Sequence, residues 1–296
     1  AAAAAAANAA AAAAAARRKA SLQGSSPSPA STKSPSDTSS TSSQGEIPVP
    51  GNAWLLAQSA AGTRRVQEAV EEASEEGRIA LLEEFRGHGV KAMRDPHANH
   101  VLQQCVRLVE PMALQFLVDE LLEREGLAAN VARHRYGGRV VQQLLKRCGA
   151  EQVSELAEVL MQEATNLACH SFGNFSVQNL LTSGTQEQRR RVARAIAKDA
   201  GSLCRSRAGD GVVAVAMEHA EPEDRLLIAH AILAEPGTLV ELAQGRHGHG
   251  AALRLLQVLD AHESLQAHMI LAEAIGTLRA SRYGRIVARH MEESMK

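Results

Sequence analysis

Four glutamines that recur in similar sequence contexts are the side chains best suited to chemistry in this sequence: Gln67, Gln103, Gln142 and Gln178. A flat side chain stands three positions before each of them, and these residues are Arg64, His100, Arg139 and Phe175. The residue before each flat side chain is short or carries an amide, in the order Thr63, Asn99, Gly138 and Asn174. Amides can form hydrogen bonds with the Watson–Crick edge of a base, and flat groups can stack on it. The pattern therefore indicates recognition of a single-stranded nucleic acid.

A glutamine is also an ordinary exposed residue of a helix, so any one of the four taken alone indicates nothing. The argument for function is the repetition of the amide at one offset in four successive units. A solvated helix face does not require that repetition, and we therefore favour the functional interpretation.

The glutamines belong to a repeat that is anchored by a small residue at the start of a predicted helix. The stretches "HRYGGRVVQQLL" (134–145) and "HSFGNFSVQNLL" (170–181) show its frame most clearly. The anchors are Gly62, Ala98, Gly137, Gly173, Gly209, Gly248 and Gly284, at spacings of 36, 39, 36, 36, 39 and 36 residues. Position +n below means n residues after the anchor. Self-similarity at such a period is the signature of a repeat architecture.

Apolar residues at positions +4, +7 and +8 form one stripe on a helix of 3.6 residues per turn. Side chains at positions +1, +2 and +5 are expected to project together on the face away from this stripe. Another apolar residue precedes each anchor by six positions, so each unit is expected to contain a helix, a glycine turn and a second helix. Residues 111–123 and 188–201 add amphipathic helical stretches between units. No alternating strand pattern appears in the sequence. We therefore predict an all-α fold, a right-handed, armadillo-like α-solenoid of about seven repeats of 36–39 residues.

Composition divides the 296-residue chain into a tail and a repeat domain. Residues 1–46 are rich in Ala and then in Ser and Pro, which predicts a disordered tail, with a targeting segment as an alternative. Residues 47–296 are the predicted repeat domain, which reaches the end of the chain shortly after its seventh unit. Either a capping element is missing there, or the sequence is a truncated form.

The net charge of −1 counts against non-specific nucleic-acid binding but does not exclude a local basic patch. The four cysteines, Cys105, Cys148, Cys169 and Cys204, show neither disulfide nor zinc spacing, so we expect reduced thiols that pack in the core. No apolar run is long enough to span a membrane. We expect a cytoplasmic protein without a metal or another cofactor.

The repeated frame resembles the Pumilio (PUF) RNA-binding repeat. Besides the two stretches quoted above, "DPHANHVLQQCV" (95–106) and "SAAGTRRVQEAV" (59–70) carry the similarity. The resemblance covers about residues 52–296, although the last three units keep the glycine and lose the recognition residues. It implies binding of single-stranded RNA, such as the 3′ untranslated regions of mRNA, and regulation of mRNA stability or translation. It also implies a monomer that recruits effector proteins through its outer face.

The resemblance further implies that one repeat recognises one base, with the RNA antiparallel to the protein. Asn with Gln is the uracil combination, which would assign uracil to Asn99/Gln103 and to Asn174/Gln178. A small residue with Gln is the adenine combination, to which Thr63/Gln67 and Gly138/Gln142 are similar. The flat residues at +2 would stack on the bases, and the predicted core is 5′-UAUA-3′. No glutamate occupies position +5, so no repeat is expected to recognise guanine.

Units five to seven carry other residues at the recognition positions, beginning with Asp210, Gly211 and Ala214 in unit five. Arginines nearby could contact phosphates, namely Arg207, Arg246, Arg282, Arg285 and Arg289. They could equally be ordinary solvated arginines. Asp210 is expected on the same face, where its charge would repel RNA.

Three other functions compete with base recognition. An enzyme is disfavoured because the sequence contains no nucleophile elbow or P-loop, and His247 and His249 lack a third metal ligand. A protein-binding scaffold of the armadillo or HEAT type fits the charge and the divergent repeats. A shape-based binder of ribosomal RNA would tolerate changes to the UAUA core and would depend strongly on salt.

Overall fold

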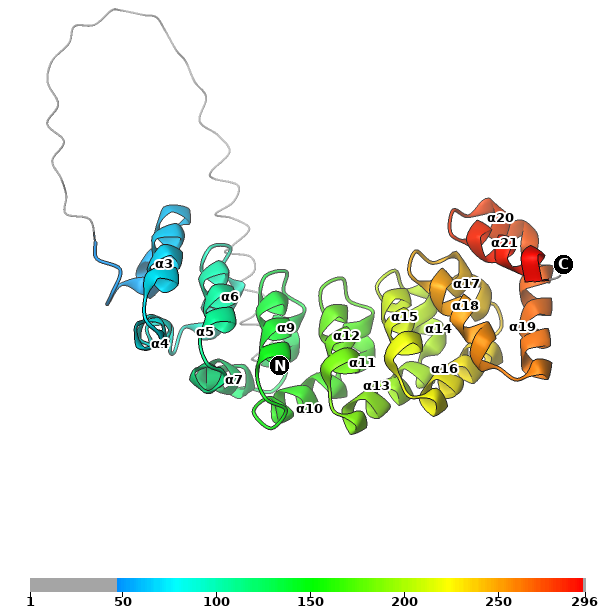
Figure 1. Cartoon of the computed structure of the whole chain (residues 1–296), viewed down its shortest axis with the longest axis horizontal. Helices are drawn as coiled ribbons and strands as arrows, with labels where there is room; N and C mark the ends of the chain where they lie inside the picture. The colour runs from blue at the N-terminus through cyan, green and yellow to red at the C-terminus, as the bar shows by residue number, and fades with distance from the viewer. Residues whose placement is uncertain (1–46, 295–296) are drawn as a thin grey trace, which may run out of the picture. The chain divides into compact units, whose positions relative to one another are not determined.

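The computed structural model describes residues 47–294, and these form helices with no strand among them. The predicted tail, residues 1–46, lies outside the described residues. Repeats one to six each contain three helices, the described part of repeat seven contains two, and successive repeats follow one another in chain order (Figure 1). The prediction of an α-solenoid is confirmed. The sequence predicted the third helix only for some of the units, in residues 111–123 and 188–201.

The helices fall into three rows. The short first helices are α2 Ala53–Ala57, α5 Gly89–Arg94, α8 Leu127–Ala132, α11 Ala164–Ala168, α14 Ala200–Arg205, α17 Thr238–Gln244 and α20 Ile275–Ala280. The second helices are α3 Ala60–Glu72, α6 Ala98–Leu108, α9 Gly137–Arg147, α12 Asn174–Ser183, α15 Gly209–His219, α18 Gly248–Val258 and α21 Gly284–Ser294. The third helices are α4 Glu75–Glu83, α7 Gln115–Leu122 after the 3-10 turn η2 Pro111–Leu114, α10 Ser154–Gln162, α13 Gln186–Lys198, α16 Pro222–Ala234 and α19 Ala261–Glu273.

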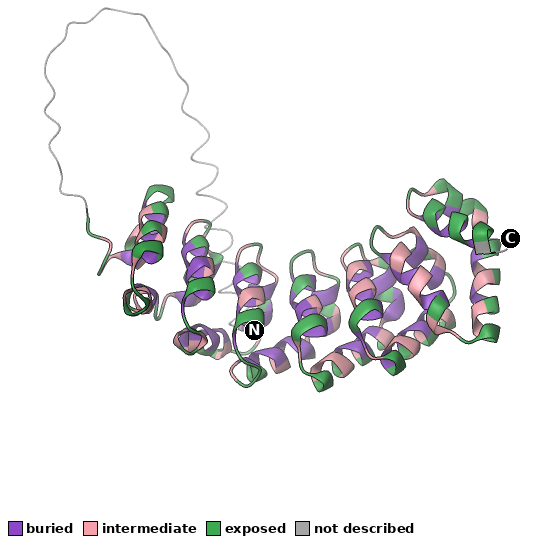
Figure 2. Cartoon of the chain, viewed as in Figure 1, coloured by how far each residue is buried: buried purple, intermediate pink, exposed green. Residues whose placement is uncertain are grey.

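The second helices pack against one another along the row, from α3 on α6 to α18 on α21. The predicted stripe faces the interior of the stack. At position +4 it contributes Val66, Leu102, Val141, Val177, Val213, Ala252 and Ala288, all at most 2% exposed. Figure 2 shows the buried residues concentrated where helices face one another. Burial of about 25 cal/mol per Å² of apolar surface, shared between neighbouring repeats, therefore holds the row together.

The anchor glycines allow the first and second helices to approach closely. A Cβ on Gly137 would lie 2.7 Å from Cγ1 of Val131, and one on Gly173 would lie 2.8 Å from Cδ2 of Leu167. Both partners stand six positions before their anchor, as the apolar residue of the repeat frame does. Neither glycine has a positive φ, so the reason for glycine here is space and not backbone conformation. The anchor Ala98 has a Cβ, and its partner position is occupied by the small residue Ala92.

Three of the third helices, α4, α13 and α19, begin at a residue whose side chain caps the helix. Thr185 and Gln188 form a capping box at the start of α13, and Asp260 and Glu263 form another at the start of α19. The predicted helical stretch 188–201 is interrupted, because α13 ends at Lys198 and α14 begins at Ala200. That break turns the chain into the first helix of the next repeat.

Three of the four cysteines are buried, and the fourth, Cys169, is exposed. The expectation that all four pack in the core is therefore wrong for Cys169. Burial raises the pKa of the Cys105 and Cys204 thiols to about 12 and that of Cys148 to about 11. These three thiols thus remain protonated and poorly nucleophilic at neutral pH.

Within residues 47–294 no single helix has the length and apolar composition of a membrane span. The pair α16 and α17 meets both criteria only when taken together, across a bend of 109°.

Candidate nucleic-acid interface

In six of the seven repeats, the loop before the second helix is fixed by a side chain three positions before the anchor. Ser59, Ser206 and Ser281 accept a hydrogen bond through Oγ from the backbone N–H of the anchor glycine, at 3.1, 3.3 and 2.8 Å. In repeat two, Oδ1 of Asp95 accepts hydrogen bonds from the N–H groups of His97 and Ala98, both at 2.8 Å. These contacts satisfy donors that a helix start leaves free and set the direction in which the second helix begins.

Repeats three and four use a histidine for the same purpose. Nδ1 of His134 accepts from the N–H of Gly137 at 3.3 Å, and Nδ1 of His170 accepts from the N–H of Gly173 at 3.2 Å. An acceptor nitrogen carries no proton, so both rings must be neutral in this arrangement. Burial, followed by the nearby charges of Arg94 and Arg135, lowers the pKa of His134. The lowered pKa favours the neutral ring that the cap requires.

The structure places the four flat residues at position +2 on the surface. Arg64, His100 and Arg139 are exposed, and Phe175 is 47% exposed. They lie on α3, α6, α9 and α12, which are neighbours in the row. These side chains are thus available to a ligand, as the stacking hypothesis requires.

The residues at position +1 do not lie on that surface. Thr63, Asn99 and Asn174 are 5%, 0% and 5% exposed, although the sequence predicted that they project beside the flat residues. Their polar atoms bind backbone carbonyls: Oγ1 of Thr63 donates to Ala57 at 2.7 Å, and Nδ2 of Asn99 donates to Asp95 at 2.7 Å. The prediction was wrong because it considered each helix alone, whereas the preceding first helix and loop cover this position.

The buried asparagines hold the glutamines of their repeats. Oδ1 of Asn99 accepts from Nε2 of Gln103 at 2.7 Å, and Oδ1 of Asn174 accepts from Nε2 of Gln178 at 2.8 Å. Both glutamines are half-buried and reach the surface that the +2 residues share. In repeats two and four, the sequence pair therefore becomes a glutamine amide whose orientation is set from below by an asparagine.

Repeats one and three lack such a support. Nε2 of Gln67 points to the carbonyl of His100 in the next repeat, at 3.5 Å. In repeat three the +1 residue is Gly138, where a Cβ would lie only 2.6 Å from the carbonyl oxygen of Ala132. Its glutamine, Gln142, is half-buried beside the glycine. The four glutamines thus occur in three settings. An asparagine holds the glutamine in repeats two and four, the glutamine of repeat one points to the next repeat, and that of repeat three lies beside a glycine.

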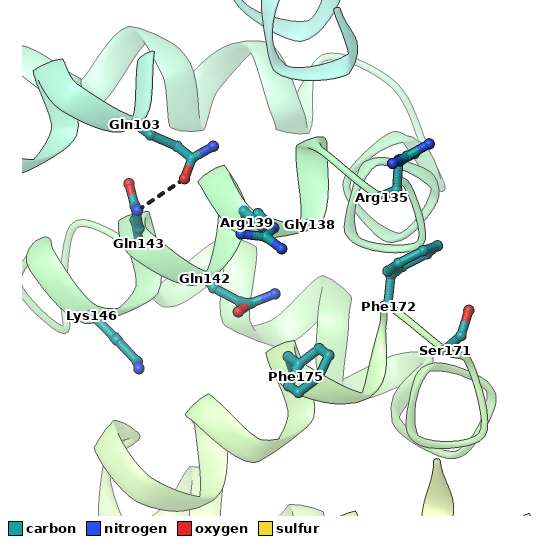
Figure 3. Close-up of a pocket in the computed structure, with 10 residues that line it drawn as sticks. All are labelled: Gln103, Arg135, Gly138, Arg139, Gln142, Gln143, Lys146, Ser171, Phe172 and Phe175. Carbon is teal, nitrogen blue, oxygen red and sulfur yellow. Dashed lines mark hydrogen bonds between the residues drawn. The ribbon is translucent and has the colours of Figure 1, made fainter. Parts of the chain in front are cut away.

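A hollow of about 430 Å³ lies over repeat three. Arg139 and Phe175, the flat residues of adjacent repeats, both line it, together with Gly138, Gln142 and Gln103 (Figure 3). A planar group in this hollow would have a guanidinium and a phenyl ring among its walls and the Gln142 amide within reach. The arrangement suits a nucleic-acid base.

A second row of amides, at position +6, was missed by the sequence analysis. Nε2 of Gln104 donates to the carbonyl of Gln67 at 3.1 Å, and Nδ2 of Asn179 donates to the carbonyl of Gln142 at 3.4 Å. Nε2 of Gln143 donates to Oε1 of Gln103 at 3.4 Å. Each amide links its own second helix to the preceding one. The doubled amides "QQ" and "QN" in the sequence are the signal that could have revealed this row.

Asp210 in repeat five is not an exposed charge, and the expectation that it repels RNA is therefore wrong. It is 3% exposed, and its Oδ2 accepts from the N–H groups of His247 at 3.1 Å and Gly248 at 3.4 Å. Repeat six has Gly245 where other repeats carry a capping side chain, and Asp210 supplies the missing cap from the neighbouring repeat. The residue therefore joins repeats five and six.

In the described part of the chain, no group of three or more His, Cys, Asp or Glu residues could hold a metal ion. His249 instead stacks on Tyr283, with ring centroids 5.3 Å apart and planes inclined by 18°. The side chain of His249 thus has a packing role between repeats six and seven.

The sequence profile of the Pumilio-family RNA binding repeat matches residues 90–122, 128–161 and 164–197. These segments coincide with repeats two to four. Suppressor protein MPT5 of Saccharomyces cerevisiae is 27% identical over 108 residues, which are 34% of this chain and 12% of that protein. Pumilio homolog 12 of Arabidopsis thaliana is 30% identical over 104 residues, which are 35% of this chain and 17% of that protein. Each match thus spans a small part of the relative.

Solved structures with a similar fold include PUF-8 in complex with PBE-RNA, with a TM-score of 0.73 and 20% identity. That similarity covers 84% of this chain and 73% of the other. The Puf3 RNA binding domain bound to a Cox17 RNA 3′ UTR recognition sequence has a TM-score of 0.69 and 17% identity, over 82% and 74% of the two chains. Repeats two to four thus match the Pumilio-family RNA binding repeat, the relatives support a Pumilio-family repeat protein, and the fold of the described chain is similar to that of the solved PUF structures.

Proposed function

We propose that this protein binds single-stranded RNA selectively through the second helices of repeats one to four. The proposal rests mainly on one observation, the hollow between Arg139 and Phe175, with the Gln142 amide in its wall. We call the surface formed by positions +2 and +5 of α3, α6, α9 and α12 the recognition face. The matched family consists of RNA-binding repeats and not of enzymes.

The supported glutamines suit uracil. With one N–H directed to Asn174, the amide of Gln178 keeps its Oε1 and its second N–H for a ligand. Uracil presents an N–H donor beside a carbonyl acceptor, which this pair of groups complements. Gln103 is also held by Asn99, and its Oε1, which accepts from Gln143 at 3.4 Å, has a second lone pair for a ligand, so repeats two and four are the proposed uracil sites.

Repeat three suits a purine. Gly138 has no side chain that could hold Gln142, so the amide in the wall of the hollow can turn toward a larger base. A free amide can pair with the N–H₂ donor and ring-nitrogen acceptor of adenine. Repeat one, with Gln67 turned toward its neighbour, is a weaker adenine site. Stacking on the +2 residues contributes about 1–3 kcal/mol per base.

The resulting core, 5′-UAUA-3′ when the RNA runs antiparallel to the protein, would occur in A/U-rich parts of mRNA. The Puf3 and Puf4 neighbours are bound to 3′ UTR recognition sequences, which supports such regions as targets. We propose that the protein acts in the cytoplasm as a monomer. It would regulate mRNA stability or translation by bringing effector proteins to these transcripts.

Fluorescence anisotropy with a labelled, U-rich RNA that contains UAUA tests the proposal. A matched RNA carries UCUC instead, and a matched variant carries Gln103→Ala and Gln178→Ala. We expect tight binding to the first RNA and a clear loss with either change. Equal, salt-sensitive binding to both RNAs would indicate recognition of shape, and no binding would favour a protein scaffold.

A further inference from the structure

The hollow of the recognition face continues into a groove along repeats four to seven. A second hollow, of about 700 Å³, shares Ser171 and Phe175 with the first. A third, of about 410 Å³, shares Ser206, Arg207 and Arg246 with the second. We call the second and third hollows the edge groove, because the loops that precede α12, α15 and α18 form much of its wall.

The second hollow begins at Phe175 and Gln178 of the recognition face, but past repeat four the recognition positions along the edge groove offer little that could distinguish one base from another. In repeat five, positions +2 and +5 are Gly211 and Ala214, both of which line the second hollow. In repeat six the same positions are Gly250 and Leu253. None of these side chains can form a hydrogen bond with a base edge, so the recognition positions of repeats five and six would not select a nucleotide by its base.

Arginines at one position, two residues before the anchor, run along the edge groove. Arg207 and Arg246 line it and are exposed, and Arg282 occupies the same position in repeat seven. No ion pair or hydrogen bond within residues 47–294 engages the guanidinium groups of Arg207 and Arg246. The guanidinium of Arg282 lies over the ring of Tyr283, 5.5 Å from its centroid. These are cations without an acidic partner.

The carboxylates in the wall of the edge groove are already engaged. Glu218 pairs with Arg254 at 3.1 Å, and Glu241 lies 3.7 Å from Arg205. Asp210 is buried and accepts backbone hydrogen bonds. The groups left free for an incoming ligand are therefore positive, although the chain as a whole carries a net charge of −1.

We propose that the edge groove binds the phosphodiester backbone of the nucleotides that flank the recognised core, without selecting their bases. The inference rests on the proposed function, because the groove begins at the recognition face. Guanidinium groups are well suited to phosphate, and the arginines recur once per repeat, as the recognition positions do. That shared period, together with the continuity of the hollows, favours RNA over an acidic peptide as the ligand.

The test uses the full chain and extends the UAUA RNA by abasic ribose-phosphates, one for each of repeats five to seven. Separate RNAs carry the extension at the 5′ or the 3′ end, and matched extensions have uncharged methylphosphonate linkages. We expect the charged extension to raise affinity at one end, which the antiparallel arrangement predicts to be the 5′ end. The methylphosphonate extension should add little.

The variant Arg207→Ala/Arg246→Ala/Arg282→Ala should lose roughly tenfold in affinity for the extended RNA at low salt. The slope of its plot of log affinity against log salt concentration should decrease in magnitude by about 2. Each of the three phosphate contacts that are removed contributes about 0.7 to that slope for a single strand. The control Arg124→Ala/Arg194→Ala/Lys198→Ala removes the same charge from exposed positions outside the groove and should behave as the wild type.

The outcomes separate the inference from the function on which it rests. If the wild type does not prefer UAUA to UCUC, the proposed function fails. If it does, but neither extension raises affinity or the gain survives the triple substitution, the inference about the groove is wrong and the proposed function stands. Binding of a polyglutamate peptide in place of the extension would overturn the inference in favour of an acidic protein partner.

Discussion

Asn174 holds the recognition glutamine of its repeat: its Oδ1 accepts a hydrogen bond from Nε2 of Gln178 at 2.8 Å, while its Nδ2 donates to the carbonyls of His170 and Ser171. The asparagine is 5% exposed, so it acts on a ligand mainly through the glutamine. Its proposed role is therefore to position Gln178 and to fix which end of the amide faces the RNA.

Asn174→Ala should reduce the discrimination between uracil and cytosine at the position of repeat four. A well-formed pair of hydrogen bonds to a base contributes about 1–3 kcal/mol of discrimination, so we expect a loss of roughly tenfold. Anisotropy with UAUA RNA and with a version that carries cytosine at that position measures the effect. Asn166→Ala, which removes an exposed amide on α11, is the control. Unchanged discrimination in Asn174→Ala would show that the glutamine does not need its support.

Asp210 caps the start of α18 in repeat six, and we expect Gly245→Ser to replace this cap. Asp210→Ala should lower the stability of the repeat array by about 1–2 kcal/mol, because the N–H groups at the start of α18 lose their acceptor. Adding Gly245→Ser should restore part of that loss, since serine caps the second helix at this position in repeats one, five and seven.

Urea unfolding followed by circular dichroism compares the two variants with the wild type. In the wild type, Gly245→Ser alone should destabilise, because its Cβ would lie 2.6 Å from Oδ2 of Asp210. Equal stabilities for Asp210→Ala and for the double variant would contradict the exchange of caps.

The anchor glycines should differ sharply from glycines in open positions. Gly209→Ala places a Cβ on the carbonyl oxygen of Leu203, so either α14 or α15 must shift. We expect a loss of about 1–3 kcal/mol, as for other overpacked sites. Gly276→Ala in α20 is the matched control, because nothing lies within 4 Å of its Cβ and alanine favours a helix by up to about 1 kcal/mol. Thermal unfolding midpoints that move in the same direction for both variants would argue against the close approach.

The helical periodicity of the sequence predicted much of this fold, and the reason is local. Positions such as Val141 and Leu144 are buried because they lie on one face of their own helix, which the sequence encodes directly. The burial of Asn99 and the cap formed by Asp210 depend on neighbouring segments. A helix considered alone places position +1 next to the exposed +2 residue, and only the packed first helix and loop show that it is covered.

The +6 amides illustrate the same limit. Gln104 and Gln143 stand next to the predicted glutamines in the sequence, yet they bond to the preceding repeat. Which of two adjacent amides faces a ligand is decided by the rotation of each helix against its neighbours. The repeat spacing fixes the order of the helices but not that rotation.

The histidine cap of repeat three should make stability depend on pH. Because the pKa of His134 is lowered in the folded protein, the unfolded chain binds the proton first as the pH falls. Its contribution is therefore fully present above the unfolded pKa of about 6.5 and is lost below it. Protonation of Nδ1 would also remove the acceptor for the N–H of Gly137.

We therefore expect the free energy of unfolding of the wild type to fall more than that of His134→Ser between about pH 7.5 and about pH 5.5. Serine can cap the same N–H through an oxygen that does not titrate in this range, as Ser206 does in repeat five. Urea unfolding at a series of pH values gives the difference between the two proteins. A difference that stays constant across the series would mean that the cap does not depend on the neutral ring. A difference that grows in the opposite direction would mean that the pKa of His134 is raised in the folded protein.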